Sequence, residues 1–185
     1  MAKNKLGRDI PENYQDTFGL FEGAFERRHT YKRASGQVTS VKPGESKLLG
    51  SIQEAIEKTG LKDGMTISFH HHFREGDRVL NMVMAEIAAM GIKNLTLASS
   101  SIANVHEPLI EHIENGVITN ITSSGLRDKL GAYISKGRME NPVVIRSHGG
   151  RARAIEKDEI HIDVAFLGAP SADCYGNANG SHGKA

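Results

Sequence analysis

The stretch from Asp63 to Gly91 reads DGMTISFHHHFREGDRVLNMVMAEIAAMG and decides the fold that the sequence predicts. It opens with an Asp-Gly turn and a short run of β-forming apolar residues from Met65 to Phe69, which favours a buried strand. It closes with apolar residues at helical spacing, which predicts a helix over 77–90 with Asp77 as N-cap and Gly91 just past its end. A polar loop with three histidines separates the two. Strand, polar loop and helix in this order indicate an α/β fold.

The same alternation continues outward from this stretch. Strands are expected at 65–70, 94–98, 117–121, 142–145 and 162–167, and helices at 48–59, 77–90, 107–114, 126–136 and 151–157. Strands that alternate with helices through short loops are typical of an open, mainly parallel sheet layered with helices and joined by right-handed crossovers. The order of the strands in the sheet cannot be read from this pattern.

Composition limits the class of protein. The 185 residues carry a formal net charge of +1 with mixed signs along the chain, which argues against a nucleic-acid-binding or polybasic membrane surface. No apolar run approaches the roughly 20 residues of a membrane span, and no secretory signal is visible at the N-terminus. One cysteine excludes an intrachain disulfide and fits a reducing compartment. A cytoplasmic location is therefore expected.

The first 44 residues differ from the rest of the chain. They are polar, with scattered aromatic residues and a basic cluster at Arg27, Arg28, Lys32 and Arg33. Two interpretations stay open, an arm that packs on another chain and a frayed tail. We therefore expect an N-terminal arm over 1–44 and one α/β domain over 45–185.

The polar loop that begins at His70 is the first candidate site, because ligands of open α/β sheets bind in loops beyond the carboxyl ends of strands. In a strand, His70 and His72 point to the same side, whereas His71 points to the other. No further ligand pair at a zinc-like spacing accompanies them, so no metal is expected. Anion binding or proton transfer by His70 and His72 with Arg74 is one interpretation, and a structural polar loop is the other.

Hydroxyl groups recur after two further strands. Ser99, Ser100 and Ser101 follow the strand at 94–98, and Ser123 and Ser124 follow the strand at 117–121. Backbone N–H groups and helix N-termini at such positions bind carboxylate or phosphate, although simple N-capping explains any single serine equally well. The recurrence favours a shared binding site.

The stretch Arg146-Ser147-His148-Gly149-Gly150-Arg151 follows the fourth strand. We expect a loop in which Gly149 and Gly150 allow close backbone approach, while Arg146, His148 and Arg151 supply positive charge. It lacks the spacing of a Walker A loop or of a dinucleotide-binding loop. The sequence therefore predicts an anion cradle, and it predicts that His70, Ser99, Ser123 and His148 meet at one edge of the sheet.

The stretch from Ile162 to Asn177, IDVAFLGAPSADCYGN, together with the loops above, resembles the coenzyme A transferase superfamily. An Asp-Val-Ala strand followed by Ala-Asp-x-x-Gly-Asn is typical of it. Within the superfamily the chain is most similar to the amino-terminal part of citrate lyase α subunits, from about Gly7 onward. The resemblance implies the sheet shared by coenzyme A transferases and sugar-phosphate isomerases, and the glycine-rich ending is expected to continue into a longer protein.

The resemblance also implies an activity. Such a subunit exchanges the acetyl group on an acyl-carrier-protein thioester for citrate, giving citryl carrier and acetate. A β subunit then cleaves citryl carrier to oxaloacetate and acetyl carrier, and the γ subunit is the carrier. No cofactor is expected to bind directly, since the carrier delivers a coenzyme-A-like prosthetic group. The alternatives are a citramalate lyase α subunit, a sugar-phosphate-binding relative without transferase activity, and a scaffold that docks through its arm.

The catalytic residue is not assigned. Glu114-Asn115-Gly116 matches a short motif around the catalytic glutamate of coenzyme A transferases, but it falls where a helix ends, which favours turn chemistry. The family's glutamate lies in the second half of its members. Cys174 has no feature in the sequence that would activate it as a nucleophile, so a small packing residue is expected there.

Overall fold

The computed structural model describes residues 1–12, 20, 42–70 and 77–181, and the chain divides into two compact units, Met1–Arg33 and Ala34–Ala185. In the first unit, β1 (Ala2–Lys3) pairs antiparallel with β2 (Asp9–Ile10). Most of the expected arm over 1–44, with its aromatic residues and basic cluster, lies outside the described residues. Both interpretations of the arm therefore stay predictions.

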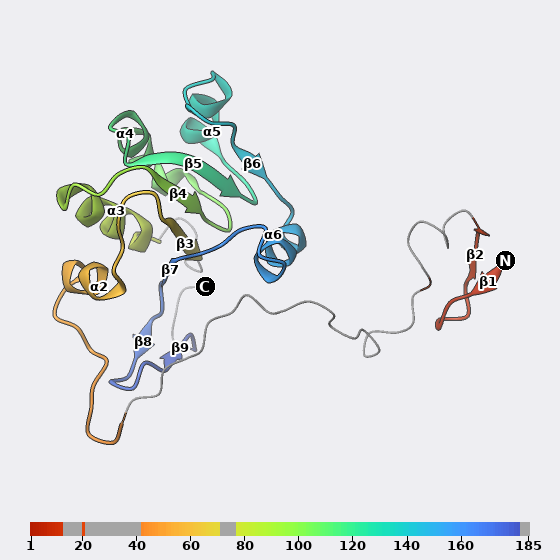
Figure 1. Ribbon diagram of the computed structural model, residues 1–185, viewed down its shortest axis with the longest axis horizontal. Helices are drawn as coiled ribbons and strands as arrows, with labels where there is room; N and C mark the ends of the chain where they lie inside the picture. Colours follow the sequence, from red (N-terminus) through yellow and green to blue (C-terminus); the bar gives the residue numbers. More distant parts are fainter. Residues whose placement is uncertain (13–19, 21–41, 71–76, 182–185) are drawn as a thin grey trace. The chain divides into compact units, whose positions relative to one another are not determined.

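A five-stranded parallel sheet forms the centre of the second unit (Figure 1). Its strands are β3 (Thr66–His70), β4 (Leu95–Ala98), β5 (Ile118–Ser123), β6 (Val144–Ile145) and β7 (Val164–Leu167). They lie in the order β6-β5-β4-β3-β7, and each neighbouring pair is parallel. The chain thus builds from β3 toward β6 and then returns to place β7 on the other side of β3. The expected parallel α/β sheet is confirmed, and the strand order reverses between β3 and β7.

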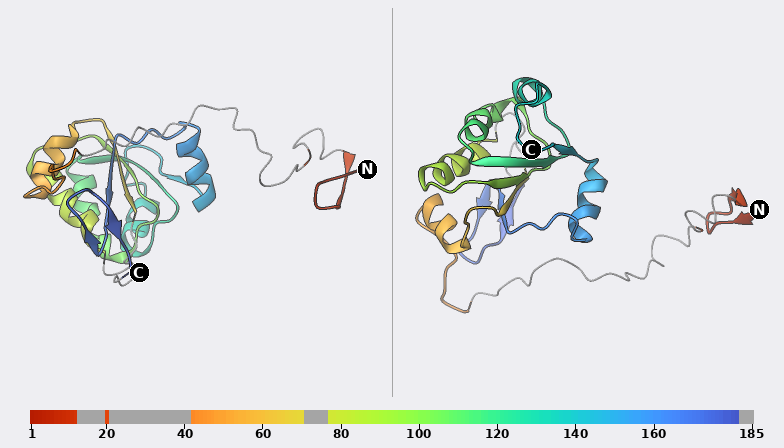
Figure 2. Two further views of the ribbon diagram at one scale, coloured as in Figure 1. Left: turned by 90° about the horizontal axis from the view of Figure 1, so that it is seen from below. Right: turned by 45° about the horizontal axis from the view of Figure 1, so that its top comes forward.

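Helices connect these strands. They are α2 (Ile52–Thr59), α3 (Val79–Ala89), the short 3₁₀ helix η2 (Asn104–His106), α4 (Leu109–Glu114), α5 (Asp128–Ser135) and α6 (His148–Glu156). Neighbouring helices from α2 to α5 contact one another and share one apolar core with the sheet. The helix α6 lies apart from them, on the other side of the sheet (Figure 2). A hairpin of β8 (Ser171–Ala172) and β9 (Ala178–Asn179) follows β7.

The two faces of the sheet have different side chains, because successive residues of a strand point to opposite sides. On β3 and β4 the buried residues Ile67, Phe69, Leu95 and Leu97 belong to the core beneath α2 to α5. The alternate residues are mainly polar and small; we call their side the second face, and on these two strands it consists of Thr66, Ser68, His70, Thr96 and Ala98. The helix α6 packs on part of this face through Ala154, which is fully buried beside Ala98 and Ile160.

The opening stretch folds as its pattern indicates, with small shifts. The helix α3 begins at Val79 rather than at Asp77, and the Asp77 carboxylate accepts a hydrogen bond from the Val79 backbone N–H at 3.0 Å. Gly91 follows the helix with φ of 77°, a conformation that glycine adopts without steric cost. The stop at Gly91 is thus confirmed, whereas the N-cap is Arg78 and not Asp77, which lies one residue further from the helix and bonds to its first N–H.

The start of the first helix was predicted wrongly. The helix α2 begins at Ile52, whereas Leu48 and Leu49 are exposed ahead of it. Ser51 is the N-cap, since its Oγ accepts from the Glu54 N–H at 3.0 Å, and the Glu54 carboxylate accepts from the Gly50 N–H at 2.7 Å. These two capping hydrogen bonds outweigh the apolar spacing that begins at Leu48. In the part of the chain that the structure describes, no helix has the length and apolarity that a membrane crossing requires.

Candidate functional site

The polar loops meet along one edge of the sheet. Because β3 to β6 are parallel, His70, Ser99, Ser123 and His148 all lie at or just beyond the carboxyl ends of successive strands. Backbone hydrogen bonds join the loops into a continuous rim, from the Ser100 N–H to the Phe69 carbonyl at 3.2 Å and from the Arg146 N–H to the Ser123 carbonyl at 2.8 Å. We call this rim the carboxyl edge. The geometric condition set from the sequence is therefore met.

The serines of this edge lie within the turns and brace them. Ser99, Ser100 and Ser123 are all buried, and the Ser99 hydroxyl donates to the Phe69 carbonyl at 3.4 Å. The Ser123 hydroxyl donates to the Gly125 carbonyl at 3.0 Å and accepts from the Gly125 N–H at 3.2 Å. Within the described residues the Ser124 hydroxyl is buried without a hydrogen-bond partner. The hydrogen bonds of Ser99 and Ser123 favour the structural interpretation for those two residues, and direct ligand binding by any of the four stays a prediction.

The predicted glycine loop after β6 is instead the first turn of α6, which begins at His148 rather than at 151. Ser147 is the N-cap, and its Oγ accepts from the Gly150 N–H at 3.0 Å. A Cβ atom on residue 150 would lie 2.9 Å from that Oγ, so Gly150 lets the cap close tightly. Within the described residues, the N–H groups of His148 and Gly149 make no internal hydrogen bond, and they lie at a helix N-terminus beside the carboxyl edge.

The arginines of this segment have separate surroundings. Arg146 forms a 3.5 Å ion pair with Glu159, and Arg153 reaches the same carboxylate at 3.1 Å. Arg151 instead turns onto the second face, where its Nη2 donates to the Ser68 Oγ at 2.8 Å and to the Ala98 carbonyl at 2.9 Å. Burial lowers the pKa of the Arg151 guanidinium below its ordinary value. The two arginines of the predicted anion cradle therefore have different partners, and the guanidinium of Arg151 contacts the centre of the sheet, while anion binding by this segment stays a prediction.

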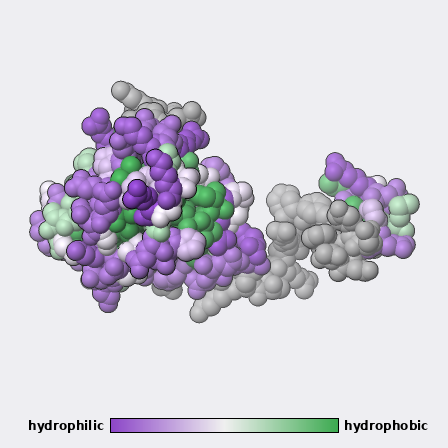
Figure 3. Space-filling view, turned by 90° about the horizontal axis from the view of Figure 1, so that it is seen from above, coloured by the Kyte–Doolittle hydropathy of each residue, from purple (hydrophilic) through white to green (hydrophobic). Residues whose placement is uncertain are grey.

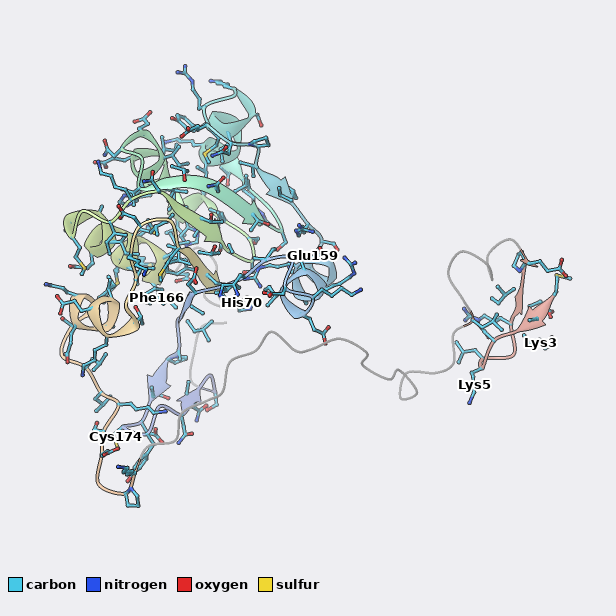
Figure 4. All side chains as sticks on the ribbon, in the orientation of Figure 1. Lys3, Lys5, His70, Glu159, Phe166 and Cys174 are labelled. Atoms are coloured by element: carbon cyan, nitrogen blue, oxygen red, sulfur yellow. The ribbon has the colours of Figure 1, made fainter. Side chains whose placement is uncertain are left out.

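His70 ends β3 and is exposed on the second face, next to α6 (Figure 4). The rings of Phe69 and Phe166 stack across β3 and β7 at a centroid distance of 5.5 Å, which fixes the backbone at the strand reversal. His72 and Arg74 lie outside the described residues, so their placement remains a prediction. Among the residues that are described, no group of three or more His, Cys, Asp or Glu side chains could hold a metal ion.

Two open depressions lie near the site. One, of about 620 Å³, lies between α5 and β6. The other, of about 330 Å³, lies on the second face; Thr66, Thr96, Asn120 and Arg146 are among its lining residues. Seen from above, the surface is mainly hydrophilic with apolar patches between the polar groups (Figure 3). Of the predicted site residues that the structure describes, Arg146 alone lines either depression.

Two further expectations concern Glu114 and Cys174. Glu114 is the last residue of α4, and Gly116 follows with φ of 70°, so this motif forms a turn as expected. Cys174 lies half-buried in the β8–β9 turn, where its carbonyl accepts from the Lys47 N–H at 2.7 Å. In the same turn, hydrogen bonds from Asn177 lower the pKa of Asp173, with smaller contributions from the N–H groups of Tyr175 and Gly176.

The sequence reasoning missed Ser68 as the partner of Arg151. The period-2 alternation of β3 placed a polar side chain on the second face, but nothing in the sequence indicated that α6 would reach it. The role of the first-turn N–H groups of α6 was also not predicted from the sequence, because the glycine pair suggested a loop in place of a helix start. Ser147 followed by Gly150 was the available signal for a helix N-terminus.

Comparisons with known proteins identify relatives of this chain. The sequence model of the family "Citrate lyase, alpha subunit (CitF)" matches residues 45–185. The citrate lyase alpha chain of Klebsiella pneumoniae is 60% identical over 140 residues, which cover 76% of this chain and 28% of that protein. The citrate lyase alpha chain of Escherichia coli is 57% identical over 144 residues, covering 78% and 28%.

A solved structure from Streptococcus mutans, described as an α subunit of citrate lyase in complex with citrate, superposes with a TM-score of 0.79. It is 71% identical in sequence, and the match covers 98% of this chain and 36% of that one. The chain thus spans about a third of the length of this relative, and 28% of the two curated relatives above. The family model covers most of the chain, and the relatives share both sequence and fold with it, so the chain belongs to the citrate lyase α-subunit family.

Proposed function

We propose that this chain takes part in exchanging the acetyl group of an acyl-carrier thioester for citrate, as part of the cleavage of citrate to oxaloacetate and acetate. The observation that carries the proposal is the convergence of polar loops at the carboxyl edge in a member of the citrate lyase α-subunit family. The complex of the Streptococcus mutans relative with citrate supports the choice of acid. Because the chain spans about a third of that relative, the exchange belongs to the whole protein rather than to these residues alone.

The reaction joins a carboxylate to a thioester. A carboxylate oxygen of citrate attacks the acetyl carbonyl carbon, and the carbon–sulfur bond breaks to give a mixed anhydride and the carrier thiolate. The thiolate then attacks the citryl carbonyl carbon and expels acetate, which leaves citryl carrier. Each attack develops negative charge on a carbonyl oxygen, so the site needs N–H donors that are already aimed at that oxygen. Citrate also brings three carboxylates, which need positively charged donors.

The residues of this chain fit parts of that task. The first-turn N–H groups of His148 and Gly149 are suited to an anion such as a phosphate on the carrier's arm, because the helix dipole adds positive potential there. His70, at the end of β3 where the strand order reverses, is our candidate for binding an anion or moving a proton. The buried serines hold the turns that present these groups.

The partners follow from the same reaction. We propose that the protein works with a lyase subunit that cleaves citryl carrier and with an acyl-carrier subunit, in the cytoplasm. The carrier would deliver a coenzyme-A-like prosthetic group, whose thiol supplies the thioester chemistry.

A chimera tests the proposal. This chain replaces the matching 36% of the Streptococcus mutans α subunit, and the chimera is assembled with acetyl carrier. Adding citrate should release acetate and form citryl carrier, at a rate comparable with that of the intact Streptococcus mutans protein. Citramalate in place of citrate tests the alternative acid. A sugar phosphate tests the alternative that the chain is a sugar-phosphate-binding relative of the same fold.

The outcome that would contradict the proposal is specific. If the intact relative releases acetate on adding citrate and the folded chimera does not, this chain does not supply what the exchange requires. Faster exchange with citramalate than with citrate would move the assignment to a citramalate lyase.

A further inference from the structure

Arg151 places a positive charge against the second face of the sheet without a compensating negative charge. Its Nη2 donates to two neutral acceptors, the Ser68 hydroxyl at 2.8 Å and the Ala98 carbonyl at 2.9 Å. Among the described residues, no carboxylate lies within ion-pair distance of its guanidinium. Arg146 and Arg153, on the same segment, both pair with Glu159. Glu159, which follows α6, thus pairs with an arginine before the helix and with one on it, whereas the half-buried Arg151 has neutral partners.

This arrangement leaves part of the Arg151 guanidinium available to an anion. A guanidinium has five N–H donors in a rigid fork, and the two hydrogen bonds of Arg151 both start from Nη2, so the donors on Nη1 and Nε remain for another acceptor. Burial lowers the pKa of Arg151, which is the sign of a charge removed from water without a countercharge. Cations in such surroundings are ordinarily paired. A carboxylate from outside these residues would supply the pair.

The location favours a ligand over a second protein chain. Ser68 is two residues before the end of β3, and it lies opposite Ala165 of β7, so Arg151 reaches the sheet where the strand order reverses. Open α/β sheets bind their ligands at this reversal. The side chains of Ser68 and His70 share the second face, because they are two residues apart on one strand. Arg151 and His70 therefore lie on the same side of the sheet, near the carboxyl end of β3.

We infer that Arg151 binds one carboxylate of the acid substrate, and that Ser68 and the Ala98 carbonyl hold its guanidinium in position for that contact. The inference rests on the proposed function for the identity of the acid. A planar guanidinium whose Nη2 is held by two acceptors presents its other donors in a fixed direction, so little side-chain entropy is lost when a carboxylate binds. Arg151 is then a specificity-determining residue for a polycarboxylate.

The test is direct titration of citrate into the 185-residue chain by isothermal calorimetry at about 0.15 M salt, which screens long-range attraction between exposed charges. Arg151→Gln should raise the Kd for citrate by about 10- to 100-fold, the size expected for a lost charge-assisted hydrogen bond. Arg153→Gln is the matched control, since it removes the same charge from the same helix at an exposed side chain. Its Kd should stay within about threefold of the unsubstituted chain, because exposed charges contribute little.

A second variant separates binding from bracing. Arg151→Lys keeps the positive charge, so circular dichroism should show a folded chain. It loses the planar guanidinium fork, so the Kd for citrate should still rise by about tenfold. If the chain does not bind citrate at up to about 10 mM, or if folded Arg151→Gln or Arg151→Lys binds it as the unsubstituted chain does, the inference is overturned. Either result leaves the exchange activity of the chimera untouched, so the inference can fail while the proposed function holds.

Discussion

Truncating two neighbouring residues on the central strand β4 should have very different effects on stability. Leu97 is fully buried in the core beneath the helices α2 to α5, whereas Thr96 points to the second face and is half-buried. Leu97→Ala removes buried methyl groups and leaves a cavity, which costs about 3–5 kcal/mol at such a site. Thr96→Ala loses a partly exposed side chain and some strand preference, which costs about 1 kcal/mol or less. We therefore expect a difference of at least about 2 kcal/mol between adjacent residues.

Urea unfolding followed by circular dichroism measures both free energies. For a domain of this size, about 4 kcal/mol corresponds to a drop in Tm of about 8–16 °C, so thermal unfolding gives an independent check. Equal losses of unfolding free energy in the two variants would contradict this expectation, because they would mean that the second face is as tightly packed as the first. A loss of cooperativity in Leu97→Ala alone would still agree with it, since this core holds β3, β4 and β5 together.

Three further effects follow from the structure. Ser147→Ala removes the N-cap of α6 and should lower the free energy of unfolding by about 1 kcal/mol, with a smaller effect for Ser171→Ala in the β8–β9 hairpin as a control. Burial lowers the pKa of His112, and the negative charge of Glu111 partly opposes this effect. As pH falls, the unfolded chain therefore takes up the proton first, so the stability contribution of His112 is complete above the ordinary pKa of about 6.5 and declines below it. His112→Gln should therefore flatten the dependence of Tm on pH between about 7 and 5. Hydrogen bonds from Asn177 are the main cause of the lowered pKa of Asp173. The β8–β9 turn should therefore stay ordered above the ordinary pKa of Asp, and it should lose that order as pH falls through the lowered pKa of Asp173. The NMR shifts of the turn amides should follow this loss of order, and Asp173→Asn should abolish their pH dependence.

The strands and helices could be predicted from the sequence because each has a local pattern of apolar residues. Periodicity located all five strands and the helices between them, since burial on one side imposes a period of 2 or 3.6 on the chain. Helix starts were less certain, because a cap such as Ser51 competes with apolar spacing that begins at Leu48. Strand order left no local signal, since hydrogen bonds between parallel strands do not depend on which apolar residues they join. The reversal between β3 and β7 therefore emerged only from the structure.

The candidate site was predictable in place but not in detail. Parallel strands put all their carboxyl ends at one edge, which is why His70, Ser99, Ser123 and His148 converge as expected. The direction of each side chain depends on residues far away in the sequence: Arg151 finds Ser68 across 83 positions. The serines looked like ligands because the sequence does not reveal that their hydroxyls bond to neighbouring carbonyls.

The second face of the sheet is only partly covered by helices. Parallel sheets are nearly always covered on both faces, yet among the described residues only α6 and its small cluster with Ala98 and Ile160 pack on this one. Its polar residues Thr66, Thr96 and Asn120 line an open depression instead of a core. Polar groups placed there favour contact with water or a polar ligand.

We propose that the carboxyl edge of the sheet binds the acid. NMR measures it most directly, through the amide shifts of the isotope-labelled chain during a citrate titration. The largest shifts should fall at the carboxyl edge, in Ser99–Ser101, Ser123–Gly125 and His148–Arg151. Largest shifts at the opposite edge, in Gly64, Asn94 and Gly116, would contradict it.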